Sequence, residues 1–298
     1  MNSRRDFLKA AGAVSISAAA PQAAQPAERQ KLPQVQLGCY SISRLICGAN
    51  VFNGGSHLSV FVNYEMKKYY TPEQILKTLR RCEEVGINCW QAGKGNLENY
   101  RHYVDSGGKM HFLALEHSEP EVVKTLARGG CIGIAHHGEV TDRLFKQGKI
   151  DQIQDYLKMV RDSGMLVGIS THMPAVVDTV ESKGWDFDYY MTCVYERHRT
   201  KEELEKLLGQ APIPVGEVYL PNDPPRMYRM VQQTKKPCLA FKILAAGRLS
   251  EHPQWIEQAF RNAFNGIKKT DAVIVGMWDR YSDQPGENAE FVRRFGAA

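Results

Sequence analysis

The chain has 298 residues, of which 43% are hydrophobic and 24% are charged, and its formal net charge is +5 at pH 7. These are ordinary values for a globular protein that can bury a large core. Lys and Arg form no run with interleaved aromatic residues, so nucleic acid is not expected as a partner.

The N-terminus has the pattern of a twin-arginine export signal. The motif Ser3–Lys9 (SRRDFLK) is followed by an Ala-rich segment and by the small residues Ala18–Ala20. We expect residues 1–34 to be a signal peptide and disordered linker, and residues 35–298 to be one barrel domain. The twin-arginine export machinery is then a partner, and the mature protein is periplasmic or secreted. No membrane span is expected after processing, because no segment approaches the ~18 continuous apolar residues that a span requires.

From residue 45 onward, short apolar runs alternate with amphipathic segments of helical spacing. The predicted strands are 45–50, 87–90, 111–115, 131–135, 165–169, 189–194, 238–244 and 272–276. The predicted helices are 71–85, 97–106, 120–129, 150–164, 175–183, 201–208, 226–234, 253–268 and 287–295. A Pro-rich stretch, 211–225, is expected to be a long loop that could cover a site. Eight strands in alternation with helices predict an α/β fold of the closed (β/α)8 TIM-barrel type, in which chemistry lies at the carboxyl ends of the strands.

The seven cysteines fit no zinc-finger or CxxC spacing, and their number is odd. Most of them are expected to be small buried apolar residues. A disulfide between Cys82 and Cys89 is an open alternative.

Several segments resemble the aldo-keto reductase superfamily, whose fold is such a barrel. The similarity is carried by Gly86-Ile87-Asn88, by the strand with His136, by the segment Gly164–Ser170, and by Val275-Gly276-Met277 with Glu287-Asn288. It covers most of residues 36–295 and implies an aldo-keto reductase-like barrel.

The resemblance also implies where catalytic and cofactor residues would lie. That family reduces carbonyls with NADPH, using a Tyr, a Lys, an Asp and a His. The Asp position falls on Gln91, the Tyr on Asn96, the Lys on or beside Glu116 and the His on His136, so only the histidine is retained. The implied NADP-binding residues are Ser170, Arg280, Glu287 and Asn288.

Imidazole and carboxylate groups follow three consecutive strands of the predicted barrel. Glu116, His117, His136 and His172 are the predicted ligands of a divalent metal, Zn, Mn, Fe or Co. Only one of His136 and His137 can point into the barrel, because neighbours on a strand face opposite ways, and the alignment favours His136. A metal-free acid/base network of the same residues is the alternative.

The predicted catalytic residues are Lys242, His137, Gln91 and Tyr195. Lys242 is a charge inside an apolar strand, and a buried lysine needs a partner. It is expected to pair with Glu116 or to act as a base with a lowered pKa.

An exported barrel with these groups and with aromatic residues at its rim suits a small sugar-like or keto-sugar substrate. The hypothesis is metal-assisted proton transfer, leading to isomerisation, elimination by a lyase, or cleavage of a glycoside. The alternatives are an NADP-dependent aldo-keto oxidoreductase and a non-catalytic sugar-binding barrel.

Overall fold

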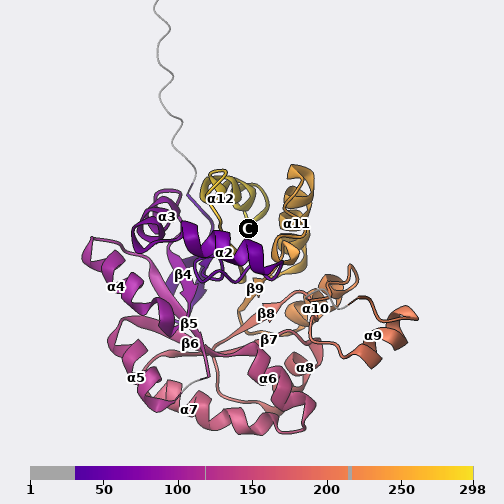
Figure 1. The fold of residues 1–298 in the computed structure, drawn as a ribbon. Helices are drawn as coiled ribbons and strands as arrows, with labels where there is room; N and C mark the ends of the chain where they lie inside the picture. The colour runs from indigo at the N-terminus through magenta and orange to yellow at the C-terminus, as the bar shows by residue number, and fades with distance from the viewer. Residues whose placement is uncertain (1–30, 118, 214–216, 298) are drawn as a thin grey trace, which may run out of the picture. The chain divides into compact units, whose positions relative to one another are not determined.

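A computed structural model describes residues 31–117, 119–213 and 217–297. The predicted export signal lies outside these residues. In the described part, eight parallel strands close into a barrel in the order β10-β3-β4-β5-β6-β7-β8-β9 (Figure 1), which confirms the predicted fold class. The barrel strands are β3 (Leu45–Gly48), β4 (Cys89–Ala92), β5 (His111–Glu116), β6 (Cys131–His136), β7 (Leu166–Thr171), β8 (Tyr189–Cys193), β9 (Cys238–Phe241) and β10 (Ala272–Gly276).

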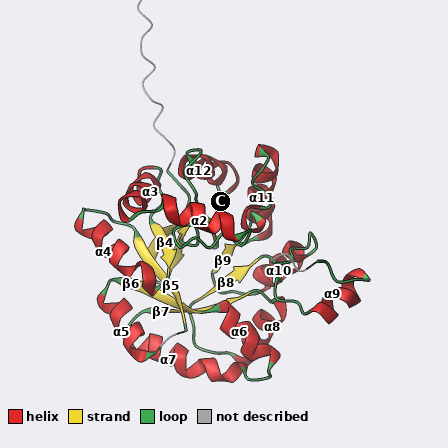
Figure 2. Cartoon of the chain, viewed as in Figure 1, coloured by secondary structure: helices red, strands yellow, loops and turns green. Residues whose placement is uncertain are grey.

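Helices surround the strands (Figure 2). They are α2 (Val60–Tyr69), α3 (Pro72–Glu84), α4 (Leu97–Asp105), α5 (Pro120–Arg128), α6 (Gly138–Lys146), α7 (Gln154–Asp162), α8 (Pro174–Lys183), α9 (Lys201–Leu208), α10 (Asp223–Gln233), α11 (Pro253–Gly266) and α12 (Gln284–Phe295). The apolar spacing explains their orientation: α3, for example, begins after the Thr71 cap and buries Ile75, Leu79 and Cys82. No helix of the described residues is long and apolar enough to cross a bilayer.

A hairpin that the sequence did not predict closes the N-terminal end of the barrel. It consists of β1 (Gln34–Leu37) and β2 (Tyr40–Ser43), paired antiparallel. Its apolar side chains belong to the same buried cluster as residues from the barrel interior. Asn88, just before β4, ties the hairpin to the barrel, because its Oδ1 accepts from Ser43 N at 2.7 Å and its Nδ2 donates to Ser41 O at 2.9 Å.

Three local predictions are corrected. The expected disordered linker does not reach Gln34, because Leu32 is 3% exposed in the core and β1 begins at Gln34. Helices α2 and α6 were not predicted. The alternative Cys82–Cys89 disulfide is wrong, since all seven cysteines are free and six of them are buried.

Candidate functional site

A cavity of about 420 Å³ opens at the C-terminal end of the barrel. Its walls come mainly from the segments that follow β3, β9 and β10. The apolar part includes Phe241 and Trp278, and the polar part includes Gln91, Lys242 and Asn288. A largely apolar cavity with a few convergent polar groups is the usual form of a small-molecule site.

Lys242 is the lysine that lines this cavity. β9 ends at Phe241, so Lys242 follows the strand instead of lying inside it, and its φ of 62° is unusual for a residue with a side chain. Its Nζ lies 3.0 Å from Nε2 of His57, in the segment between β3 and α2. Burial lowers the pKa of Lys242 to about 8. At pH 7 an amine with this pKa is mostly charged and about one tenth neutral.

His57 holds the amine in place. Its Nδ1 lies 2.9 Å from Oε1 of Glu217, and because a carboxylate can only accept, Nδ1 carries the proton. Nε2 is then free to accept a hydrogen bond from Lys242. Burial, helped by the charge of Lys242, lowers the pKa of His57 to about 3, so the ring stays neutral.

Two arginines support this arrangement. Arg197, whose side chain is 6% exposed, bridges the carboxylates of Glu139 and Glu217. Arg248 donates to the backbone oxygen of His57 at 3.0 Å. The predicted pairing of Lys242 with Glu116 is therefore replaced by a hydrogen bond to a neutral histidine, with Glu217 behind it.

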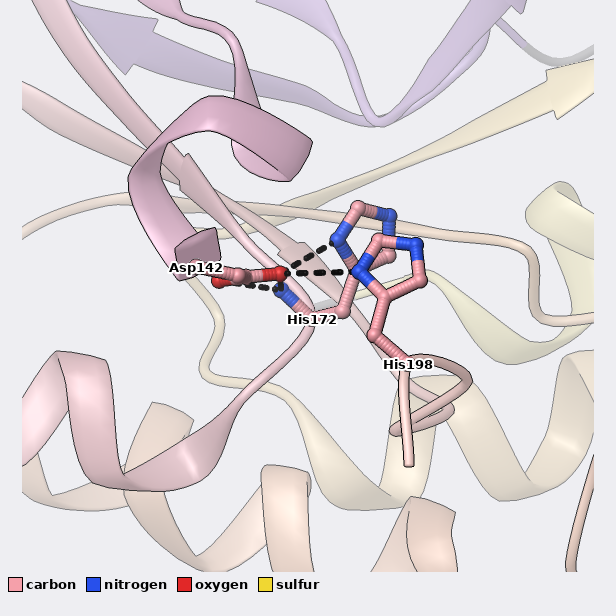
Figure 3. Close-up of side chains that lie close together, drawn as sticks. All are labelled: Asp142, His172 and His198. Atoms are coloured by element: carbon pink, nitrogen blue, oxygen red, sulfur yellow. Dashed lines mark hydrogen bonds and ion pairs between the residues drawn. The ribbon is translucent and has the colours of Figure 1, made fainter. Parts of the chain in front are cut away.

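A second polar cluster lies beside the cavity. It consists of Asp142 from α6, His172 directly after β7, and His198 from the segment after β8 (Figure 3). Nδ1 of His172 lies 2.7 Å from Oδ2 of Asp142, and Nδ1 of His198 lies 3.6 Å from the same oxygen. Phe241 connects the two regions, because its ring contacts His172 at 5.5 Å and also lines the cavity.

The carboxylate of Asp142 is held in its charged form. Burial opposes ionisation, but the hydrogen bonds from His172 and Thr171 and the nearby imidazole of His198 lower the pKa of Asp142 to about 2. Burial lowers the pKa of His172 to about 4, although Asp142 acts in the opposite direction. An anionic oxygen that faces two imidazoles can either accept hydrogen bonds or share a cation with them.

The structure corrects the expectation that His136 points into the barrel. Ala135 belongs to the interior cluster, so His136 faces the helices, where its Nδ1 lies 2.7 Å from Thr141 Oγ1 and its ring packs on Tyr156. Burial lowers the pKa of His136 to about 3. His137, a predicted catalytic residue, follows the strand and caps α6, where its Nδ1 accepts from Glu139 N at 3.3 Å; it does not line the cavity.

The other predicted metal ligands are also not gathered into one site. Oε1 of Glu116 accepts from the backbone nitrogen of Lys94 at 2.7 Å. His117 is exposed, and its ring lies 5.5 Å from that of His137. Of the four predicted ligands, only His172 belongs to the cluster with Asp142 and His198.

Among the predicted catalytic residues, Lys242 and Gln91 line the cavity. Tyr195 does not. It is 7% exposed and packs against Tyr219 with ring centres 5.0 Å apart, and burial raises its pKa to about 12. Its phenol is part of the packing beneath the Pro-rich segment.

The residues implied for NADP do not form one surface. Glu287 and Asn288 line the cavity, but the hydroxyl of Ser170 is fully buried and has no hydrogen-bond partner among the described residues. Arg280 pairs instead with Glu65 at 2.6 Å. Asn96, at the family's Tyr position, is buried and donates to Asn53 at 3.1 Å. The donor set therefore does not fit a nicotinamide nucleotide as that family holds it.

The sequence interpretation missed most of the groups around Lys242 and His172. These residues are His57, Asp142, Arg197, His198 and Glu217. None of them ends a predicted strand directly. Two features of the sequence pointed to some of them. Glu217 lies in the Pro-rich stretch that was expected to cover a site, and residues 196–199, after β8, are densely charged.

The fold and the site define a (β/α)8 barrel with its reactive side chains at the carboxyl ends of its strands. No family model matches the chain. No curated protein matches its sequence. Among solved structures, it is similar to the glycerol dehydrogenase AKR11B4 from Gluconobacter oxydans, with a TM-score of 0.52, 12% identity, and coverage of 89% of this chain and 91% of that one.

It is similar to the same degree to a truncated 3-deoxy-D-arabino-heptulosonate 7-phosphate synthase from Thermotoga maritima. The TM-score is 0.52 and the identity 13%, again over 89% of this chain and 91% of that chain. At this identity the likeness shows the barrel fold alone. An aldo-keto reductase is thus among the structural neighbours, and so is a synthase.

Proposed function

We propose that the chain is an enzyme that removes a proton from a sugar-like carbonyl compound bound in the cavity, with Lys242 as the base. The single observation that carries the proposal is the amine of Lys242, which lines the cavity, has a pKa lowered to about 8 and is hydrogen-bonded to a neutral histidine. A base with a pKa near the working pH is the most effective proton acceptor.

The geometry leaves the lone pair of the neutral amine available. One N–H of Lys242 is donated to His57, which therefore acts as a positioning residue, and Glu217 fixes the tautomer of His57. Lys242 takes the proton from the carbon next to the carbonyl of the substrate. Return of this proton to the former carbonyl carbon, while the hydroxyl proton of the enediol passes to the other oxygen, is isomerisation. Loss of a substituent from the β-carbon, on the other side of the deprotonated carbon, forms a C=C bond and is elimination, the lyase outcome that would also release a glycoside.

Two features favour a polyhydroxylated substrate. The amide groups of Gln91 and Asn288 are placed to exchange hydrogen bonds with hydroxyls, and Trp278 offers an aromatic surface in the same cavity. The twin-arginine motif of the sequence supports a role in the periplasm or outside the cell.

A divalent ion remains part of the proposal, with a different ligand set from the one predicted. Asp142, His172 and His198 could hold it, and Phe241 contacts His172 while lining the cavity. An ion there would supply Lewis acidity beside the substrate.

The test is exchange of substrate C–H hydrogen in D2O, followed by proton NMR with fructose, dihydroxyacetone and a 3-keto-glucoside. We expect the wild-type chain to exchange the hydrogen next to the carbonyl of at least one of these, and Lys242→Met to lose this activity. Lys235→Met changes an exposed lysine and serves as the matched control. Exchange that survives in Lys242→Met refutes the assignment of the base.

Two further outcomes separate the alternatives. Binding of a sugar by calorimetry without exchange of any hydrogen would favour a non-catalytic barrel. Oxidation of NADPH that depends on a carbonyl compound would favour the oxidoreductase.

A further inference from the structure

We propose that Asp142, His172 and His198 form a binding site for one divalent first-row transition ion of the Zn²⁺ or Co²⁺ type. This inference deepens the proposed function by assigning the ligands and type of its ion, but it does not rest on proton transfer by Lys242, whose amine is hydrogen-bonded to His57.

The three side chains already present their ligand atoms to one point. One nitrogen from each imidazole and one carboxylate oxygen lie within 4.8 Å of one another. Figure 3 shows both rings on the same side of the carboxylate, each directing a nitrogen at it. Bonds of about 2.0–2.2 Å in a tetrahedral site place neighbouring ligand atoms about 3.3–3.6 Å apart. The observed separations of 2.7 and 3.6 Å from Oδ2 of Asp142 therefore need only small side-chain shifts.

Neighbouring groups also contact Asp142 and His198. Thr171 donates its hydroxyl to Oδ1 of Asp142 at 2.5 Å, and the backbone nitrogen of His172 donates to Oδ2 at 3.0 Å. Nε2 of His198 lies 3.8 Å from Oε1 of Glu139, which is too long for a hydrogen bond but places a carboxylate on the far side of the ring. Two nitrogens and one carboxylate oxygen leave a coordination position for water or substrate, as in many catalytic metal sites.

A hydrogen-bonded pair of Asp142 and His172 without any ion is the competing explanation. It accounts for the 2.7 Å contact, and packing of the two imidazole rings, whose centres lie 4.6 Å apart, accounts for the presence of His198 beside them. Nδ1 of His198 faces the same oxygen at 3.6 Å, which is beyond hydrogen-bonding distance. A cation between the three groups explains why the second ring is directed there.

The experiment is titration of the full, untagged chain with Co²⁺ after removal of metal with a chelator, followed by displacement with Zn²⁺. We expect one Co²⁺ per chain, with the visible absorption of a four- or five-coordinate ion that disappears on addition of Zn²⁺. Glu139→Gln is expected to weaken affinity by about 10–100-fold, the range typical of a group that orients a ligand. His198→Ala is expected to weaken it further.

His198→Ala is the decisive variant, because it leaves the hydrogen bond between Asp142 and His172 in place, so the fold should persist by circular dichroism. His102→Ala removes an exposed histidine of α4 and is the matched control. Less than stoichiometric Co²⁺, or equal affinity in wild type and His198→Ala, overturns the proposal. Lys242→Met should bind Co²⁺ normally, so loss of hydrogen exchange and loss of metal can be told apart.

Discussion

Replacing Lys242 by Met should stabilise the protein at neutral pH while removing the proposed base. The pKa of Lys242 lies at about 8 instead of the ordinary 10.5, because burial disfavours the ammonium form. Each pKa unit corresponds to 1.36 kcal/mol, so holding the charged form inside the fold costs about 3 kcal/mol. Some solvent reaches the side chain, and we expect about 2 kcal/mol to be measurable.

Because the pKa of Lys242 is lowered by folding, the stability difference between wild type and Lys242→Met depends on pH. Below pH 8 the amine is charged in both the folded and the unfolded chain, and the full cost is present. Between about pH 8 and 10.5 the unfolded chain binds more protons than the folded one, so wild-type stability rises with pH relative to the variant. Above pH 10.5 the amine is neutral in both states and this cost is absent.

The measurement is urea unfolding of wild type, Lys242→Met and Lys235→Met at pH 7 and pH 10.5. Other titrating groups contribute equally to wild type and variant, so they cancel in the difference between the two free energies of unfolding. We expect the difference for Lys242→Met to fall by about 2 kcal/mol from pH 7 to pH 10.5. A difference that is the same at both pH values would refute a lowered pKa. Lys242→Met also loses the hydrogen bond to His57, which is worth about 1 kcal/mol. This loss shifts the stability difference equally at pH 7 and pH 10.5, so the change between the two pH values is unaffected.

Three further substitutions test the hydrogen bonding of Asp142 and the packing of β7. Asp142→Asn should lower the free energy of unfolding by about 2–4 kcal/mol at pH 7, because it removes the charge that accepts from His172; a loss below about 0.5 kcal/mol in urea unfolding would contradict this. Gly168→Ala places a Cβ 2.4 Å from the ring of Tyr189, so a fall of about 1–3 kcal/mol is expected in the same assay, and an unchanged midpoint would show that the ring has room to move. Ser170→Ala removes a buried hydroxyl without a partner among the described residues and should raise stability by about 1 kcal/mol, whereas a loss would indicate that the hydroxyl is satisfied in solution.

The sequence predicted the barrel because its strands are buried on both faces and therefore appear as continuous apolar runs. β8 is buried at every position, and β7 at every position but its first. The sequence did not predict α6, because this short helix starts at a glycine and has no Ser, Thr, Asp or Asn cap; His137 caps it instead. The hairpin was missed because its four-residue strands pair only with each other.

The sequence predicted residues of the candidate site only where they lie at the carboxyl end of a strand or directly after it. Lys242 and Gln91 follow or end strands and reach the cavity. For His136 the rule gave the correct end of the barrel and the wrong face, because facing depends on a register that one sequence does not fix. Asp142 and Glu217 reach the site from a helix and from a long connection, so their proximity to His172 and His57 is a property of the tertiary fold.

Backbone strain at non-glycine residues of the described chain lies at one end of the barrel. The positive φ angles of non-glycine residues in the described chain are those of His57, Lys242, Ala245 and Ala246, all in the two segments that follow β3 and β9 at the C-terminal end. Such conformations cost about 1–3 kcal/mol each and persist only where the surrounding structure enforces them. At the opposite end, hydrogen bonds join the hairpin to Asn88. The strained conformations of His57 and Lys242 thus coincide with the cavity in which Lys242 is the proposed base.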